Sequence, residues 1–139
     1  MPRFVQLLSG VAVMVSLSSA AFAEDITALL AKSDANAGKA KAAVCLACHT
    51  ADKGGAAKIG PNLWGTEGRP IASVAGYTYS SGMQGMKAQK WTVENLDQYL
   101  TAPATFVKGN KMAFPGIKNA QDRANIIAWL RTLADKPAK

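Results

Sequence analysis

Cys45-Leu46-Ala47-Cys48-His49 is the stretch of this chain that most constrains its fold, because it has the C-x-x-C-H spacing typical of covalent c-type haem attachment. Two cysteines three positions apart on a helix can both reach the vinyl groups on one edge of a porphyrin and form thioethers with them. The histidine that follows then points its imidazole at the iron, for which neutral imidazole is a good ligand. The motif therefore predicts one haem, bound through Cys45 and Cys48, with His49 as an axial ligand.

Other roles for the two cysteines fit the sequence less well. A zinc site needs about four Cys or His ligands, whereas the chain has two cysteines and one histidine. A disulfide is stable in an oxidising compartment, but it would close a very small loop here and leave His49 without a role. A thioredoxin-like redox pair is expected near a βαβ pattern, which the sequence does not show.

The second axial ligand has to come from elsewhere in the chain. Since His49 is the only histidine, a second histidine ligand is excluded, and methionine is the usual alternative. Met83 and Met86 lie in a loop rich in Gly and Ser, and we interpret them as core side chains. Met112 lies in a segment whose glycines permit close backbone approach and where Phe114 can shield the ring. Met112 is therefore the predicted ligand.

Around the motif, helical periodicity and capping residues predict an all-α domain. The expected helices cover residues 35–48, 93–101 and 120–134, with a weaker one at 26–32. Their expected N-caps are Asp34 or Asn36, Thr92, and Asn119. Residues 50–90 are rich in glycine and show no alternation typical of a strand. They predict a long irregular loop, with a short helix near 81–87, and a haem to wrap around would explain such a loop.

Residues 1–23 have the pattern of a cleaved secretory signal peptide. Arg3 supplies the positive start, an apolar run extends from Phe4 to about Leu17, and Ala21-Phe22-Ala23 provides an A-x-A cleavage site. The apolar run is interrupted by polar residues and is shorter than the ~20 apolar residues that a spanning helix needs. We therefore expect residues 24–139 to form one exported domain, with an uncleaved membrane anchor as the alternative.

The charge of the chain bears on its partners. The formal net charge is +7, and Arg3 is the only basic residue before position 24. A basic surplus favours an acidic partner surface or transient contact with an anionic membrane face. Nucleic acid is not favoured, because no run of five basic residues occurs and export argues against it.

Taken in order, the motifs resemble those of class I c-type cytochromes, close to mitochondrial cytochrome c and bacterial cytochrome c₂. The resemblance covers nearly all of residues 24–139. After C-x-x-C-H it rests on these segments: Lys53-Gly54-Gly55, Gly60-Pro61-Asn62-Leu63, Gly68-Arg69, Tyr77-Thr78-Tyr79, Trp91, Tyr99-Leu100, Pro103, Lys111-Met112 and Ile127-Ala128-Trp129-Leu130. It implies the cytochrome c fold, with three to five helices and long loops wrapped around one covalent haem c.

The resemblance also implies roles for residues on the two sides of the haem. The Pro61 carbonyl would accept the hydrogen bond of the second His49 nitrogen, which fixes the orientation of the ring. Tyr99 would lie near the sulfur of Met112, with Phe114 shielding the haem.

At the opposite edge, the resemblance implies a site for a buried haem propionate. Tyr79 and Trp91 would donate hydrogen bonds to it, and Arg69 would supply the compensating charge, because a buried anion needs such partners.

The implied function is electron transport by a soluble, monomeric, periplasmic carrier that moves one electron at a time by outer-sphere transfer. Its implied partners are redox proteins: a membrane oxidase, a reductase, a photosynthetic reaction centre or a periplasmic dehydrogenase. Lys58, Lys111 and Lys118 match lysines that surround the exposed haem edge in the family. We expect no enzyme activity, since a peroxidase needs an open iron position and a distal acid or base. Gas-binding four-helix cytochromes are also disfavoured, because they carry C-x-x-C-H near the C-terminus.

Overall fold

The computed structural model describes residues 25–137, so the expected signal peptide lies outside the described residues. Between residues 25 and 137 there are six α-helices, one 3₁₀-helix and no strand, which confirms the all-α class. The elements are α1 (Ile26–Leu30), α2 (Ala35–Lys41), the 3₁₀-helix η1 (Ala42–Ala47), α3 (Ser81–Gly85), α4 (Val93–Thr101), α5 (Pro103–Phe106) and α6 (Ala120–Thr132). None of the helices in this range is long and apolar enough to cross a bilayer.

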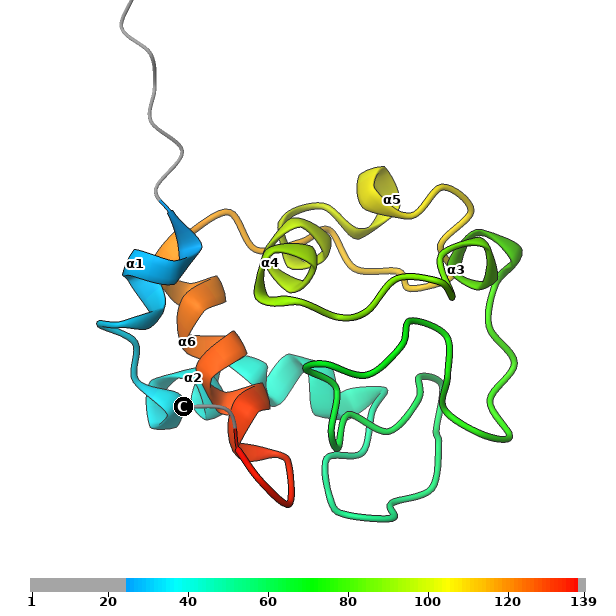
Figure 1. Cartoon of the computed structure of the whole chain (residues 1–139), viewed down its shortest axis with the longest axis horizontal. Helices are drawn as coiled ribbons and strands as arrows, with labels where there is room; N and C mark the ends of the chain where they lie inside the picture. The colour runs from blue at the N-terminus through cyan, green and yellow to red at the C-terminus, as the bar shows by residue number, and fades with distance from the viewer. Residues whose placement is uncertain (1–24, 138–139) are drawn as a thin grey trace, which may run out of the picture.

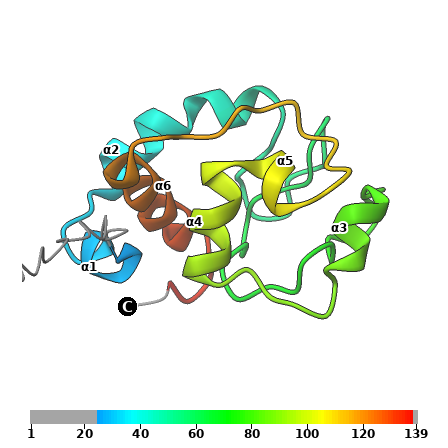
Figure 2. The same cartoon turned by 90° about the horizontal axis from the view of Figure 1, so that it is seen from above.

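The N- and C-terminal helices pack against each other, as Figures 1 and 2 show for α2 and α6. Their backbones meet at Gly38, where an added Cβ would overlap the carbonyl of Asn125. Two polar contacts fix the crossing: the Asp34 amide donates to Asn125 Oδ1 at 3.0 Å, and Lys41 pairs with Asp122 at 2.9 Å. A residue without a side chain is therefore needed where the two helices cross.

The first predicted helix is shorter as an α-helix than the sequence suggests. It spans Ala35–Lys41 and then tightens into η1, which runs to Ala47, instead of continuing as α-helix to residue 48. The side chain of Asp34 caps it by accepting from the Asn36 amide, which decides between the two expected caps. A 3₁₀ turn is common at the end of an α-helix, and residue propensity does not separate the two helix types.

The other predicted helices agree closely with the structure. Helix α4 has the expected bounds, and Thr92 caps it by accepting from the Asn95 amide. Helix α6 starts after the expected cap, Asn119, but ends at Thr132, two residues before the predicted end. The carbonyl of Leu133 instead accepts from the Gly65 amide at 2.6 Å, which ties the end of this helix to the long loop.

The long loop between η1 and α4 contains α3 and is closed by a single antiparallel bridge between Pro70 and Lys90. Helix α5 is not among the predicted helices, since a proline just after α4 is typical of a helix end. Proline also suits the first turn of a helix, where its missing N–H is not needed, and Pro103 is the first residue of α5.

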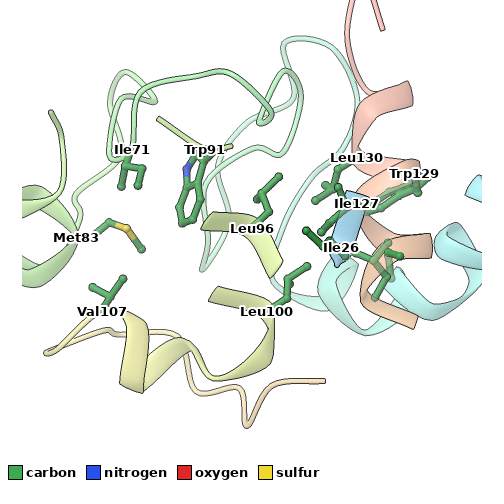
Figure 3. Packing of buried hydrophobic residues seen from close by; sticks show 13 residues of the cluster. Ile26, Ile71, Met83, Trp91, Leu96, Leu100, Val107, Ile127, Trp129 and Leu130 are labelled. Atoms are coloured by element: carbon green, nitrogen blue, oxygen red, sulfur yellow. The ribbon is translucent and has the colours of Figure 1, made fainter. Parts of the chain in front are cut away.

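The buried apolar side chains lie in two groups that α4 connects (Figure 3). Ile71, Met83 and Val107 lie beside Trp91, whereas Ile127, Trp129 and Leu130 of α6 lie with Ile26 of α1; Leu96 and Leu100 of α4 lie between the two groups. Met83 is buried in this core and Met86 packs partly against it, as their interpretation as core side chains requires. The core thus joins both chain ends to the loop that follows the C-x-x-C-H motif.

Candidate haem-binding site

The tight winding of η1 positions the two cysteines. The amides of Cys48 and His49 both donate to the Cys45 carbonyl, at 3.0 and 2.9 Å. In a 3₁₀ turn residues i and i+3 eclipse each other, so Cys45 and Cys48 lie on the same side of the chain. Both thiols are free and half-buried, and burial raises the pKa of the Cys45 thiol above its usual value. This is the arrangement that two thioether bonds to one porphyrin edge need.

The ring of His49 is fixed by two neighbouring residues. Its Nδ1 lies 2.6 Å from the carbonyl oxygen of Pro61. A carbonyl only accepts, so Nδ1 carries the proton and donates, and Nε2 keeps its lone pair for a metal. Gly60 is buried against the ring, where a Cβ would overlap it. The bond that the resemblance implies is thus present, and Nε2 is the nitrogen available to iron.

Met112 lies in the segment between α5 and α6, within reach of the partly buried Tyr99. The Tyr99 hydroxyl is 3.8 Å from Met112 Sδ and 3.2 Å from Asn110 Oδ1. Asn110 also accepts from the Met112 amide and donates to its carbonyl, both at 3.2 Å. Burial raises the pKa of Tyr99 to about 12, so the phenol is a neutral donor at physiological pH. Phe114 is half-buried, and its amide donates to the Met112 carbonyl at 2.9 Å.

Arg69 has a buried donor that remains available to an acidic group. Its Nη1 donates to the Trp64 carbonyl at 2.7 Å and its Nη2 approaches the Asn62 carbonyl at 3.3 Å. Its Nε is the one buried side-chain nitrogen or oxygen without a hydrogen-bond partner in the part of the chain that the structure describes. Burial lowers the pKa of the guanidinium, which nevertheless stays charged. A buried donor left unpaired is costly, so this atom fits a haem propionate.

Of the two aromatic residues expected beside the propionate, one is buried in the core and the other is partly buried against it. Trp91 is buried, with its ring centroid 5.0 Å from that of Tyr99. The Tyr79 hydroxyl accepts from the Val74 amide at 3.2 Å, which leaves its own proton free for another acceptor. Burial raises the pKa of this phenol, so it remains a donor. The chemistry of the donor set therefore fits the haem.

Three residues that hold the site together had no individual role assigned from the sequence. Asn110 positions both the backbone of Met112 and the Tyr99 hydroxyl. Asn62 is buried, donates to Thr50 Oγ1 and accepts from the Trp64 amide, so it orders the chain after Pro61. Gly60 provides space for the His49 ring. The local signal of Asn62 and Asn110 is their residue type, since each accepts from the amide two residues ahead, a bond that asparagine commonly makes.

Comparison with known proteins agrees with this arrangement. The family model described as Cytochrome c matches residues 35–134, and the chain belongs to the cytochrome c family. Cytochrome c from Gossypium barbadense is 47% identical over 87 residues, which are 63% of this chain and 78% of the relative. A cytochrome c homolog from Bradyrhizobium diazoefficiens is 37% identical over 121 residues, 86% of this chain and 65% of the relative. The solved structure of cytochrome cH from Methylobacterium extorquens is 36% identical, with a TM-score of 0.66, and the match covers 71% of this chain and 98% of that one.

Family membership establishes the cofactor and the general role. Proteins of this family carry haem c covalently, and Cys45 and Cys48 stand at the required spacing, so the chain binds haem c through these two residues. It is an electron carrier and acts with redox partners.

Proposed function

We propose that this chain is a soluble periplasmic carrier with one haem, which passes a single electron at a time between redox proteins by outer-sphere transfer. The observation that carries the proposal is the His49 ring, whose Nδ1 is held by the Pro61 carbonyl so that Nε2 keeps its lone pair for iron, next to the turn that carries the two cysteines. When bound, haem supplies a one-electron couple whose potential depends on its axial ligands and surroundings.

His49 and Met112 are the proposed axial ligands. If both side chains bind the iron, no position would remain open for peroxide or carbon monoxide, which supports a role as a carrier and not as an enzyme. The two ligands also limit the structural change that accompanies electron transfer. Pro61 holds His49 in place, and Tyr99 lies against Met112. A methionine opposite a histidine raises the reduction potential.

The remaining site residues tune this environment. Leu63 and Ile117 pack against the core and, with half-buried Phe114, exclude water from the site. Arg69, Tyr79 and Trp91 serve as partners of a propionate, which the free Arg69 Nε and the free Tyr79 proton support. Exclusion of water strengthens these charge interactions.

Periplasmic location and docking follow from the sequence pattern and from charge. Residues 1–23 direct export and are removed, which leaves residues 24–139. Lys58, Lys111 and Lys118 are exposed and steer an acidic face of an oxidase, reductase, reaction centre or dehydrogenase toward the haem edge. We expect the carrier to meet these partners as a monomer.

The sharpest test of the ligand assignment is the spectrum of the oxidised protein with and without Met112. We expect the weak far-red charge-transfer band of Met-ligated haem in the unaltered protein and its loss in Met112→Leu. Met86→Leu is the matched control, since Met86 is a partly buried core residue, and it should keep the band. Carbon monoxide should bind the reduced Met112→Leu protein and not the parent. A band that survives in Met112→Leu would refute the assignment.

A further inference from the structure

The segment that carries Met112 has few backbone ties to the rest of the fold. It leaves α5, passes Met112 and reaches α6 without forming a helix (Figure 2). Of the described residues 110–118, only Ile117 makes a backbone hydrogen bond to another element, with its amide donating to the Leu100 carbonyl of α4 at 2.8 Å. Something else must hold the end of this segment in place.

The guanidinium of Arg123 provides that second attachment. Arg123 lies in α6 and is buried, with 9% of its surface exposed. Its Nη1 donates to two successive carbonyls at the end of the segment, those of Ile117 and Lys118, both at 2.9 Å. Its Nε donates to Asp97 Oδ1 of α4 at 2.6 Å. One side chain therefore joins α6, α4 and the end of the Met112 segment.

The pairing of Arg123 with Asp97 fixes the direction of the other hydrogen bonds that Arg123 makes. A buried guanidinium is stable only with its charge paired and its donors used, and Asp97 meets the first condition while the two carbonyls meet the second. The guanidinium is planar, so pairing through Nε fixes the direction in which Nη1 points. The Met112 segment also packs closely against α4 at Gly116, where an added Cβ would overlap the Thr101 carbonyl.

We propose that Arg123, oriented by Asp97, is a positioning residue that keeps the sulfur of Met112 at its binding position by clamping the end of its segment to α4. The inference rests on the proposed ligation by Met112. Loss of the clamp raises the fraction of molecules in which Met112 has left the iron, while the His49 side of the site stays as it is.

Arg131 offers a matched control on the same helix. Its guanidinium binds Glu67 in a bidentate pair at 2.7 and 3.0 Å and is also largely buried. Glu67 lies in the long loop that follows Pro61, away from the Met112 segment in sequence. Arg123→Gln and Arg131→Gln therefore both remove an arginine–carboxylate pair from α6, but only the first removes bonds to the Met112 segment.

The test measures how tightly free imidazole binds to the oxidised, haem-loaded variants. Loss of the far-red band is the signal that reports binding. Imidazole occupies the iron only in molecules from which Met112 has departed, so its apparent dissociation constant falls as that fraction grows. We expect at least a tenfold fall for Arg123→Gln, since two hydrogen bonds from a charged donor are lost. Arg131→Gln should leave the constant within about twofold of the parent, although denaturant unfolding should show that both variants are less stable.

A second variant keeps the test decisive if Arg123→Gln does not fold. Arg123→Lys retains the charge for Asp97 but has no planar fork, and it should give a fall of about threefold or more. An unchanged constant in the folded Arg123 variants, or an equal change in Arg131→Gln, would overturn the clamp. Absence of the far-red band from the parent protein would overturn the ligand assignment and the clamp together, which separates the two failures.

Discussion

At the scale of single residues, Tyr99 has one hydroxyl proton and two acceptors within reach. The oxygen lies 3.2 Å from Asn110 Oδ1 and 3.8 Å from Met112 Sδ, and burial keeps the phenol neutral. A donor directed at a sulfur ligand withdraws electron density from it and so favours the reduced metal. Tyr99 therefore acts on the reduction potential through the ligand and does not touch the metal itself.

Tyr99→Phe should lower the reduction potential and leave the far-red band in place. A neutral hydrogen bond contributes about 1 kcal/mol, which corresponds to a change of about 40 mV at most in a one-electron couple. Tyr77→Phe is the control, because the Tyr77 hydroxyl donates to the Ile59 carbonyl and not toward Met112. Redox titration of the three proteins measures the effect, and equal potentials for the parent and Tyr99→Phe would contradict this role.

Site residues of rare types could be predicted from the sequence alone, whereas site residues of common types could not. Cys45, Cys48 and His49 are the only residues of their kinds in the chain, so their pattern could be interpreted directly. The roles of Pro61 and Tyr99 needed the family resemblance, since a proline carbonyl or a tyrosine hydroxyl has no local signature. The chain has six asparagines and four arginines, and residue type alone does not distinguish the ones that the fold brings to the site.

At the scale of elements, the crossing of α2 and α6 depends on a residue without a side chain. Gly38→Ala places a Cβ on the Asn125 carbonyl, so the helices must separate, and we expect a loss of about 1–3 kcal/mol in the free energy of unfolding. Gly85→Ala is the control, since nothing lies within 4 Å of its Cβ position. That change should be neutral or stabilising by less than about 1 kcal/mol. Urea unfolding measures both variants, and equal stabilities would show that the crossing tolerates a methyl group.

Helix bounds were predictable where a side chain marks the end of the element. Thr92 and Asn119 accept from amides of the first turns of α4 and α6, and both starts were predicted. The change from α2 to η1 was not, because alanine and lysine suit both kinds of helix. The end of α6 also depends on a distant residue, Gly65, whose amide binds the Leu133 carbonyl.

At the scale of the whole molecule, the surplus of basic over acidic residues sets the response to charged reagents. Oxidation of the reduced protein by anionic ferricyanide should slow several-fold as salt rises, since screening weakens the attraction. Oxidation by a cationic cobalt(III) complex should become faster under the same conditions, because screening then weakens a repulsion. Stopped-flow rates across a range of ionic strength test both, and rates that do not respond to salt would contradict docking steered by lysines.

The path of the long loop could not be derived from the sequence. Residues 50–90 have no periodicity, and their course depends on contacts between distant residues, such as the Pro70–Lys90 bridge and the bond from the Gly65 amide to the Leu133 carbonyl. The all-α class and the helices of the C-terminal part were predictable, because apolar spacing in residues 93–134 is clear.

The most direct test of the account is the intact mass of the denatured, exported protein. The account predicts the mass of residues 24–139 plus one haem, retained in denaturant because Cys45 and Cys48 are bonded to it. Replacement of both cysteines by alanine should abolish that increment. A mass equal to the bare polypeptide would contradict the account, and a mass that includes residues 1–23 would contradict removal of the signal peptide.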